Sequence, residues 1–522
     1  MTLPAHKYLR ARLTDFFDPA TSWERSLWTV GSIQCLVEVL EAARLTSAHG
    51  AAERTLREVR QSTRQVACAD PGVGPSERRT EIRKLLDSDL HSASAIEQLG
   101  HVTRLARRGY LERWRPVLDE GASEGLERSA RSIGAHLLDS GYSSDHLMRW
   151  LRAVGDAVSS TNDLLDASIE LSRKPSREYE ALVAFSRIPG VPHRLADGWM
   201  TASAVSTWLA ERGHDPVRQV GGFCIPVRAR DPWAAVERVG ALVGRLQARV
   251  DIGLAGRNTS LTASPQVWID GKDKPYSLAP SRRPLEVHSL GRQDMVLSLR
   301  LDDQSDEVDF ALELLAPLHA ATDPSALAGG WATLESLYSE AGGGAHTASI
   351  GASKVVAASW PRAELTRLAY AYAGSQSDEL ARCISNAPAN RTRAELMANA
   401  IATDLAGEFA SESDRCAAER LRQLLQDPNA VLSRVSDHLE RSFQRLYRQR
   451  NLLMHAGGVR SSSLAATLRT TPSLVGEAVD RAVHAHSSES LSTSALVARA
   501  RHELAMVGKP GGRHVSHLLE RP

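Results

Sequence analysis

The sequence lacks the features of secreted, membrane-spanning and metal-binding proteins. It contains no apolar run of the about 18 residues that a membrane-spanning helix needs. Residues 1–8 lead into charged sequence without the apolar segment of a secretion signal. We therefore expect a cytoplasmic protein without membrane contact. The cysteines are scattered, odd in number and without a pair at metal-binding spacing, which fits a reducing compartment. They are Cys35, Cys68, Cys224, Cys383 and Cys416.

Motifs of several enzyme classes are missing as well. There is no Gly-x-Ser-x-Gly, His-Glu-x-x-His or Cys-x-x-Cys, which leaves serine hydrolases, zinc proteases and thiol oxidoreductases without support. The glycine-rich stretch 341–346 lacks the Gly-Lys-Ser/Thr of a phosphate-binding loop and is interpreted as a flexible connection. No cofactor and no metal site is predicted. The formal net charge is only +1, so any nucleic-acid site must be a local patch.

Length and composition predict a soluble protein of several domains. With 522 residues the chain is too long for one core, and 42% hydrophobic with 24% charged residues is typical of globular proteins. Apolar positions recur every three to four residues over 1–175, which predicts a helical domain interrupted at 70–75. The region 324–500 is helical again, and 501–522 is expected to be a flexible tail. The fold class is therefore mainly α and multidomain.

The region 176–318 differs, because short apolar runs alternate with helical segments. This pattern predicts a small central α/β or α+β domain, with a ferredoxin-like arrangement as one option. Aromatic residues of the preceding helices are interpreted as core residues and not as a platform for bases; they are Trp114, Tyr142 and Trp150. The expected strands are 181–186, 222–227, 266–269 and 295–299, the expected helices 203–212 and 233–246, and the expected loop 274–284.

The segment 447–458 carries the most informative pattern of the chain. Arg450, Asn451 and His455 are the groups needed to cleave a phosphodiester without a metal: a cation for the charge of the phosphorane and an imidazole for proton transfer. At about 100° per residue, Asn451 and His455 share one helix face, whereas Arg450 lies about 140° from His455. A second helix or a second copy of the chain would complete such a site. We therefore expect a homodimer.

The residues after the motif predict where its helix ends. Gly457 and Gly458 form a natural stop, which puts His455 in the last turn, where the helix dipole favours a protonated imidazole. A structural interpretation stays open at this point, because an Arg-Asn pair at a helix end and a capping histidine would give the same spacing.

The run Arg450-Asn-Leu-Leu-Met-His455 resembles the Arg-Asn-x3-His signature of the HEPN superfamily, and more closely its Apea-like branch. Upstream, the segment 330–338 resembles the Trp-x-x-Leu-Glu helix that opens such domains. The resemblance covers roughly residues 320–490. It implies a helical bundle in which two units form one composite ribonuclease site, and a function in bacterial defence or as a toxin.

The resemblance also implies residue roles. Arg450 would bind phosphate and stabilise the transition state, His455 would act as general acid or base, and Asn451 would orient groups by hydrogen bonds. Glu335 would support them from the opening helix, although a solvated helical carboxylate explains it equally well. The implied reaction is attack of a ribose 2′-hydroxyl that leaves a 2′,3′-cyclic phosphate. RNA is the expected partner, with contacts from three further arginines that a solvated helix face would explain as well: Arg441, Arg445 and Arg448.

Two other hypotheses remain. The bundle could be a non-catalytic RNA-binding or dimerising scaffold, in which case no cleavage would be found. Alternatively, the N-terminal and central regions could sense a phage-derived or small-molecule trigger and gate the nuclease.

Overall fold

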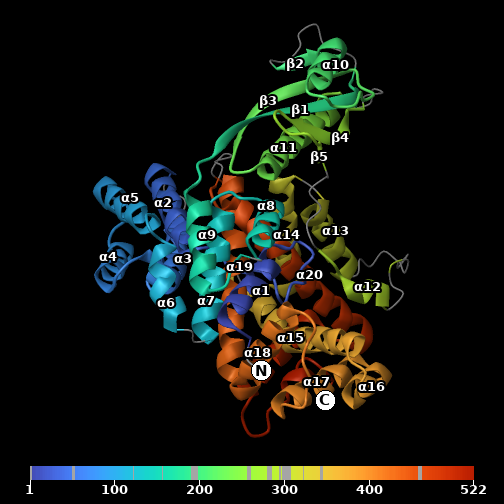
Figure 1. The fold of residues 1–522 in the computed structure, drawn as a ribbon. Coiled ribbons are helices and arrows are strands. Elements are labelled where there is room, and N and C mark those ends of the chain that lie inside the picture. Colours follow the sequence, from blue (N-terminus) through green and yellow to red (C-terminus); the bar gives the residue numbers. More distant parts are fainter. Residues whose placement is uncertain are drawn as a thin grey trace. The chain divides into compact units, whose positions relative to one another are not determined.

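The computed structural model describes residues 3–49, 53–120, 123–155, 157–189, 198–254, 260–278, 285–292, 296, 307–320, 322–340, 345–455 and 461–521. The chain forms two compact units. A helical unit contains Met1–Asp139, Val154–Ile169 and Arg283–Pro522, and a sheet unit contains Ser140–Ala153 and Glu170–Arg282. Helices dominate the described residues, which confirms the mainly α prediction (Figure 1). No helix among the described residues is both long and apolar enough to cross a membrane.

The N-terminal part of the helical unit is a series of helices joined by short turns. The expected break at 70–75 is a 3-10 turn, Pro71–Val73, at which the Asp70 carboxylate accepts a hydrogen bond from the Gly72 amide at 2.7 Å. Trp114 is buried as expected. The helices are α1 (Ala5–Phe17), α2 (Ser32–His49), α3 (Glu53–Ala67), α4 (Ser76–Asp87), α5 (Ala93–Arg107), α6 (Arg115–Glu120), α7 (Ser123–Asp139) and α9 (Thr161–Arg173), whose last residues belong to the sheet unit.

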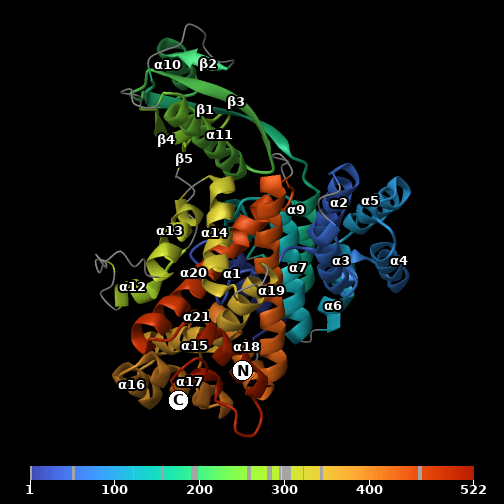
Figure 2. The same cartoon turned by 180° about the vertical axis from the view of Figure 1, so that it is seen from behind.

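The C-terminal part of the same unit surrounds the long helices α15 and α19 (Figure 2). Its core contains Trp331, Tyr372 and Phe443 together with Trp28 from the N-terminal part, all of them almost fully buried. Apolar side chains from both ends of the chain therefore share one core. The helices are α12 (His288–Arg292), α13 (Glu307–Ala320), α14 (Asp323–Tyr338), α15 (Ala345–Ser375), α16 (Glu379–Asn386), α17 (Asn390–Ala402), α18 (Glu412–Gln426), α19 (Pro428–His455), α20 (Leu464–Glu489) and α21 (Thr493–Met506).

Buried ion pairs also join the two ends of the chain. Glu364 of α15 is fully buried, 2.6 Å from Arg25 and 3.2 Å from Arg420. A buried charge requires a partner, so these contacts hold the N-terminal residues against the C-terminal helices. The predicted separation into a domain 1–175 and a domain 324–500 is therefore wrong, because the two regions form one unit.

The C-terminal residues are packed and do not form the flexible tail predicted for 501–522. Helix α21 continues to Met506, and Val515, Leu518 and Leu519 are buried in the core of the helical unit. His517 lies 3.3 Å from Glu395. The error came from the glycines and histidines after Lys509, which concealed three apolar anchors.

The sheet unit is an antiparallel five-stranded sheet with a helix on each face. Strand β1 is central, and its residues alternate: Val183 and Phe185 pack with α11, whereas Leu182 and Ala184 pack with α10. Burial on both faces explains its continuous apolar run. The order is β2-β3-β1-β4-β5, formed by β1 (Arg177–Arg187), β2 (Trp199–Thr201), β3 (Gly221–Ala229), β4 (Thr262–Ile269) and β5 (Tyr276–Ser277), with α10 (Ala202–Glu211) and α11 (Pro232–Gly253).

Three predicted strands lie in β1, β3 and β4, and the two predicted helices lie in α10 and α11. The predicted strand 295–299 lies, except for residue 296, outside the described residues. The order of elements along the chain is ββαβαββ, which differs from the β-α-β-β-α-β order of ferredoxin-like domains. Helix α8 (Ser144–Gly155) largely belongs to this unit, because Ser143 before it hydrogen-bonds Asp231 at 2.7 Å. The sheet domain thus begins before residue 176.

Candidate functional site

Helix α19 positions the predicted catalytic residues near its C-terminal end. The helix begins with Pro428, where a missing amide hydrogen has no cost, and His455 is its last described residue. Arg450 and Asn451 occupy the preceding turn and are half-buried. The side chain of His455 and residues 456–460, which include the predicted glycine stop, lie outside the described residues.

A hydrogen bond joins two members of the predicted site. Arg450 Nη1 donates to Asn451 Oδ1 at 3.0 Å. Around the helix, Asn451 lies about 100° from Arg450 and about 40° from His455. The bond therefore draws the guanidinium toward the helix face on which His455 is placed.

Arg445 and Arg448 are buried against α2, and their predicted contact with RNA is wrong for this structure. Glu38 lies 2.7 Å from Arg445 and 3.7 Å from Arg448, and the two arginine side chains are only 4% and 3% exposed. Burial lowers the pKa of Arg448, and the charge of Glu38 opposes this effect only in part. Both guanidinium groups therefore form part of the contact between α2 and α19.

Arg441 remains partly accessible. Its guanidinium lies 3.3 Å from Gln65 Oε1 and 3.0 Å from His438 Nδ1. Burial, followed by the neighbouring charge of Arg441, holds the pKa of His438 well below its usual value. His438 is therefore neutral at neutral pH and can accept a hydrogen bond from Arg441.

Glu335 is exposed on α14 and is not brought to Arg450. Trp331 of α14 packs on Tyr447, with ring centroids 4.8 Å apart. At the C-terminal end of α14, Tyr338 lies against Gly351 of α15. One turn further along α15, Lys354 donates a hydrogen bond to Ser436 of α19. Ser436 lies well before Arg450 in α19. Helix α14 thus runs away from the Arg450 end of α19. Glu335 lies one turn further along that direction than Trp331.

The chain just after the motif is anchored to α2. Gln34 Nε2 donates to the hydroxyls of Ser462 and Ser463, both at 2.8 Å. Glu41 accepts hydrogen bonds from the Ser461 hydroxyl at 2.9 Å and from the Ser462 amide at 3.0 Å. Helix α2 therefore holds both α19 and the start of α20. Its polar residues had no local signal, because their partners are more than 400 positions away.

Within the part of the chain that the structure describes, no group of three histidine, cysteine, aspartate or glutamate side chains could hold a metal. No family model matches this chain, and no curated protein or solved structure matches it either. The arrangement of Arg450, Asn451 and Arg441 is therefore the basis on which a function must be argued.

Proposed function

We propose that this protein is a metal-independent endoribonuclease of the HEPN type. The observation that carries the proposal is the hydrogen bond from Arg450 to Asn451, which turns a cation toward the helix face of His455. An arginine in that position would bind a phosphate oxygen through charge-assisted hydrogen bonds. The resemblance of the run 450–455 to the HEPN signature supports the same assignment.

In this mechanism His455 takes the proton of a ribose 2′-hydroxyl. The oxygen then attacks the adjacent phosphorus, the bond from phosphorus to the 5′-oxygen of the next nucleotide breaks, and the protonated imidazole gives its proton to that leaving oxygen. Arg450 stabilises the negative charge that builds up on the phosphorane, while Asn451 keeps the guanidinium in place. The products are a 2′,3′-cyclic phosphate and a free 5′-hydroxyl. DNA has no 2′-hydroxyl and is not a substrate.

The proposal includes a homodimer. One α19 supplies a single Arg450 and a single His455, and a second copy would supply a second set across the composite site that the resemblance implies. Of the predicted RNA-binding arginines, Arg441 is the one that remains partly accessible. We assign it to phosphate binding beside the site.

The burial of Arg445 and Arg448 favours one competing function. It removes two of the four predicted cations from the surface, which would suit a scaffold that dimerises or binds RNA weakly without cutting it. The two functions differ in their response to His455→Ala. An enzyme loses cleavage and keeps RNA affinity, whereas a scaffold has no cleavage to lose.

The test is cleavage of labelled single-stranded RNA and total tRNA in excess EDTA, with analysis of the product ends. We expect wild type to cut, and Arg450→Ala and His455→Ala to be slower by about 100-fold or more, as for loss of one transition-state group. Arg434→Ala changes an exposed arginine of the same helix and is the matched control. If neither wild type nor the variants cleave RNA, even after addition of phage-infected lysate, the scaffold function would be favoured.

A defence or toxin function belongs to the same proposal. Expression of wild type should then slow growth, with or without phage, and Arg450→Ala should relieve the effect. Equal growth of both strains under both conditions would contradict it.

A further inference from the structure

A groove between α2 and α5 lies apart from the predicted nuclease residues. It has a volume of about 520 Å³ and is lined by Arg44 of α2 and by residues 91–104 around α5. Small-molecule sites usually measure about 300–1,000 Å³. The groove is therefore large enough for a ligand of nucleotide size, and much larger than a lone phosphate ion.

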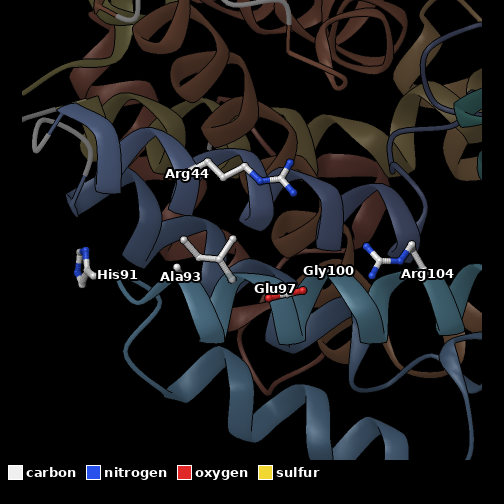
Figure 3. Close-up of a pocket in the computed structure, with 7 residues that line it drawn as sticks. Arg44, His91, Ala93, Glu97, Gly100 and Arg104 are labelled. Atoms are coloured by element: carbon white, nitrogen blue, oxygen red, sulfur yellow. The ribbon is translucent and has the colours of Figure 1, made fainter.

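Two guanidinium groups converge in this groove. Figure 3 shows the side chains of Arg44 and Arg104 extending toward one another from facing helices. Both are exposed, and neither has an ion pair or a hydrogen bond to another described side chain. Two arginines that face each other without a carboxylate between their head groups repel one another. A phosphate placed between them would remove this repulsion and would accept hydrogen bonds from both.

The remaining lining suits the rest of a nucleotide. Gly100 is buried and lines the groove without a side chain of its own; its neighbours there are Arg104 Nη1 and Leu40, at 3.6 Å and 3.9 Å from the position a Cβ would take. Ala93 and Ile96 add apolar lining to the groove. Glu97 lies below the two guanidinium groups in Figure 3 and can accept hydrogen bonds from hydroxyl groups. At the other end of the groove, His91 is held by Glu53 at 3.2 Å.

We infer that the groove between α2 and α5 binds a nucleoside phosphate, with the phosphate between Arg44 and Arg104 and the sugar hydroxyls toward Glu97. A nucleoside phosphate carries an anionic phosphate next to the hydroxyl donors of its sugar. This arrangement matches the two cations and the one carboxylate of the groove. The inference does not rest on the proposed ribonuclease activity, because the groove residues and the residues of the Arg450 site are different. Binding and cleavage can therefore be measured separately.

The site can be tested by isothermal titration calorimetry on the full chain with AMP, adenosine, pyrophosphate and a short single-stranded RNA. We expect AMP to bind, and adenosine to bind at least about tenfold more weakly, because it lacks the phosphate. Arg44→Ala and Arg104→Ala should each weaken AMP binding by about tenfold or more. Arg57→Ala changes an exposed arginine of the neighbouring α3 and should alter the affinity by less than about twofold.

Glu97→Gln separates the sugar contact from the phosphate contact. We expect it to leave pyrophosphate binding unchanged or tighter, since a negative charge is removed, and to reduce the preference for AMP over pyrophosphate. Four results would overturn the proposal: no binding of AMP at millimolar concentration, equal AMP affinity of wild type and Arg104→Ala, an equal loss with Arg57→Ala, or binding of RNA without AMP. Circular dichroism of each variant checks that the exposed substitutions leave the fold intact.

Discussion

Four arginines of α19 lie in two very different environments. Arg445 and Arg448 are buried against Glu38 of α2, whereas Arg441 and Arg450, which flank them along the helix, stay partly exposed. The buried pair stabilises the contact between helices, because a guanidinium in a low-dielectric interior needs a carboxylate. The partly exposed pair has no carboxylate partner of this kind and hydrogen-bonds neutral side chains instead: Arg441 contacts Gln65 and His438, and Arg450 contacts Asn451. The same residue type therefore meets a buried carboxylate or neutral partners according to what covers it.

Loss of the carboxylate that pairs with the buried arginines is expected to destabilise the protein strongly. Glu38→Ala leaves two buried guanidinium groups without their carboxylate, and breaking a buried ion pair in this way costs about 3–5 kcal/mol. Urea unfolding should show this loss in the free energy of unfolding. Glu335→Ala removes an exposed carboxylate from α14 and should change the stability by less than about 0.5 kcal/mol. Similar losses of stability for the two variants would show that Glu38 does not stabilise the buried arginines.

A second prediction concerns a buried carboxylate on α20, the helix that follows α19 in the chain. Burial is the main cause that raises the pKa of Glu477 from 4.5 to about 7, with Arg481 opposing and Asp480 adding to it. Between these values the folded protein holds a proton that the unfolded chain has lost. The stability that this proton contributes is therefore present at low pH and is lost as the pH rises through about 7.

Glu477→Gln removes this titration while leaving an oxygen that can accept the hydrogen bond from Ser359. Relative to the variant, wild type should lose up to about 1.4 kcal/mol of stability per pH unit between about pH 4.5 and 7. Urea unfolding at several pH values measures the slope. Glu379→Gln, at an exposed carboxylate, should keep the wild-type slope. Parallel curves for wild type and Glu477→Gln would contradict the prediction.

The contact between Glu41 and the turn after the motif is expected to contribute less to stability than either of the buried carboxylates. Glu41→Ala removes the acceptor for the Ser461 hydroxyl and the Ser462 amide, which should cost about 1 kcal/mol. Hydrogen exchange of the Ser462 amide should become faster, while exchange within α15 stays unchanged. Asp87→Ala breaks the exposed ion pair with Arg64 and should cost little. Unchanged exchange at Ser462 would show that α2 does not hold this turn.

Elements with a strong local signal were predictable from the sequence. Apolar periodicity located the helices, and short apolar runs located β1, β3 and β4. Local rules failed where distant segments decide the outcome. Residues 1–139 share a core with the C-terminal helices, and Leu518 and Leu519 hold a tail that its glycines suggested was flexible.

At the candidate site, too, local sequence patterns did not reveal how distant segments pack. The spacing of Arg450, Asn451 and His455 predicted a helical segment, which lies in α19, and the structure adds the bond between the first two. The spacing could not show which face of α19 is covered, because Glu38 lies 407 positions before Arg445. A periodic pattern specifies which residues share a face, but not the element that packs on it.

The pairing of Glu38 with Arg445 has a consequence for synthesis of the protein. A ribosome that adds about 5–20 residues per second needs about 20–80 s to travel from one residue to the other. During this interval α2 has no α19 to pack on, while the strands of the sheet unit emerge complete and can fold. The helix that carries Arg450 therefore meets its support only after the whole sheet unit has been synthesised. A chain released early would contain neither a supported α2 nor the predicted active site.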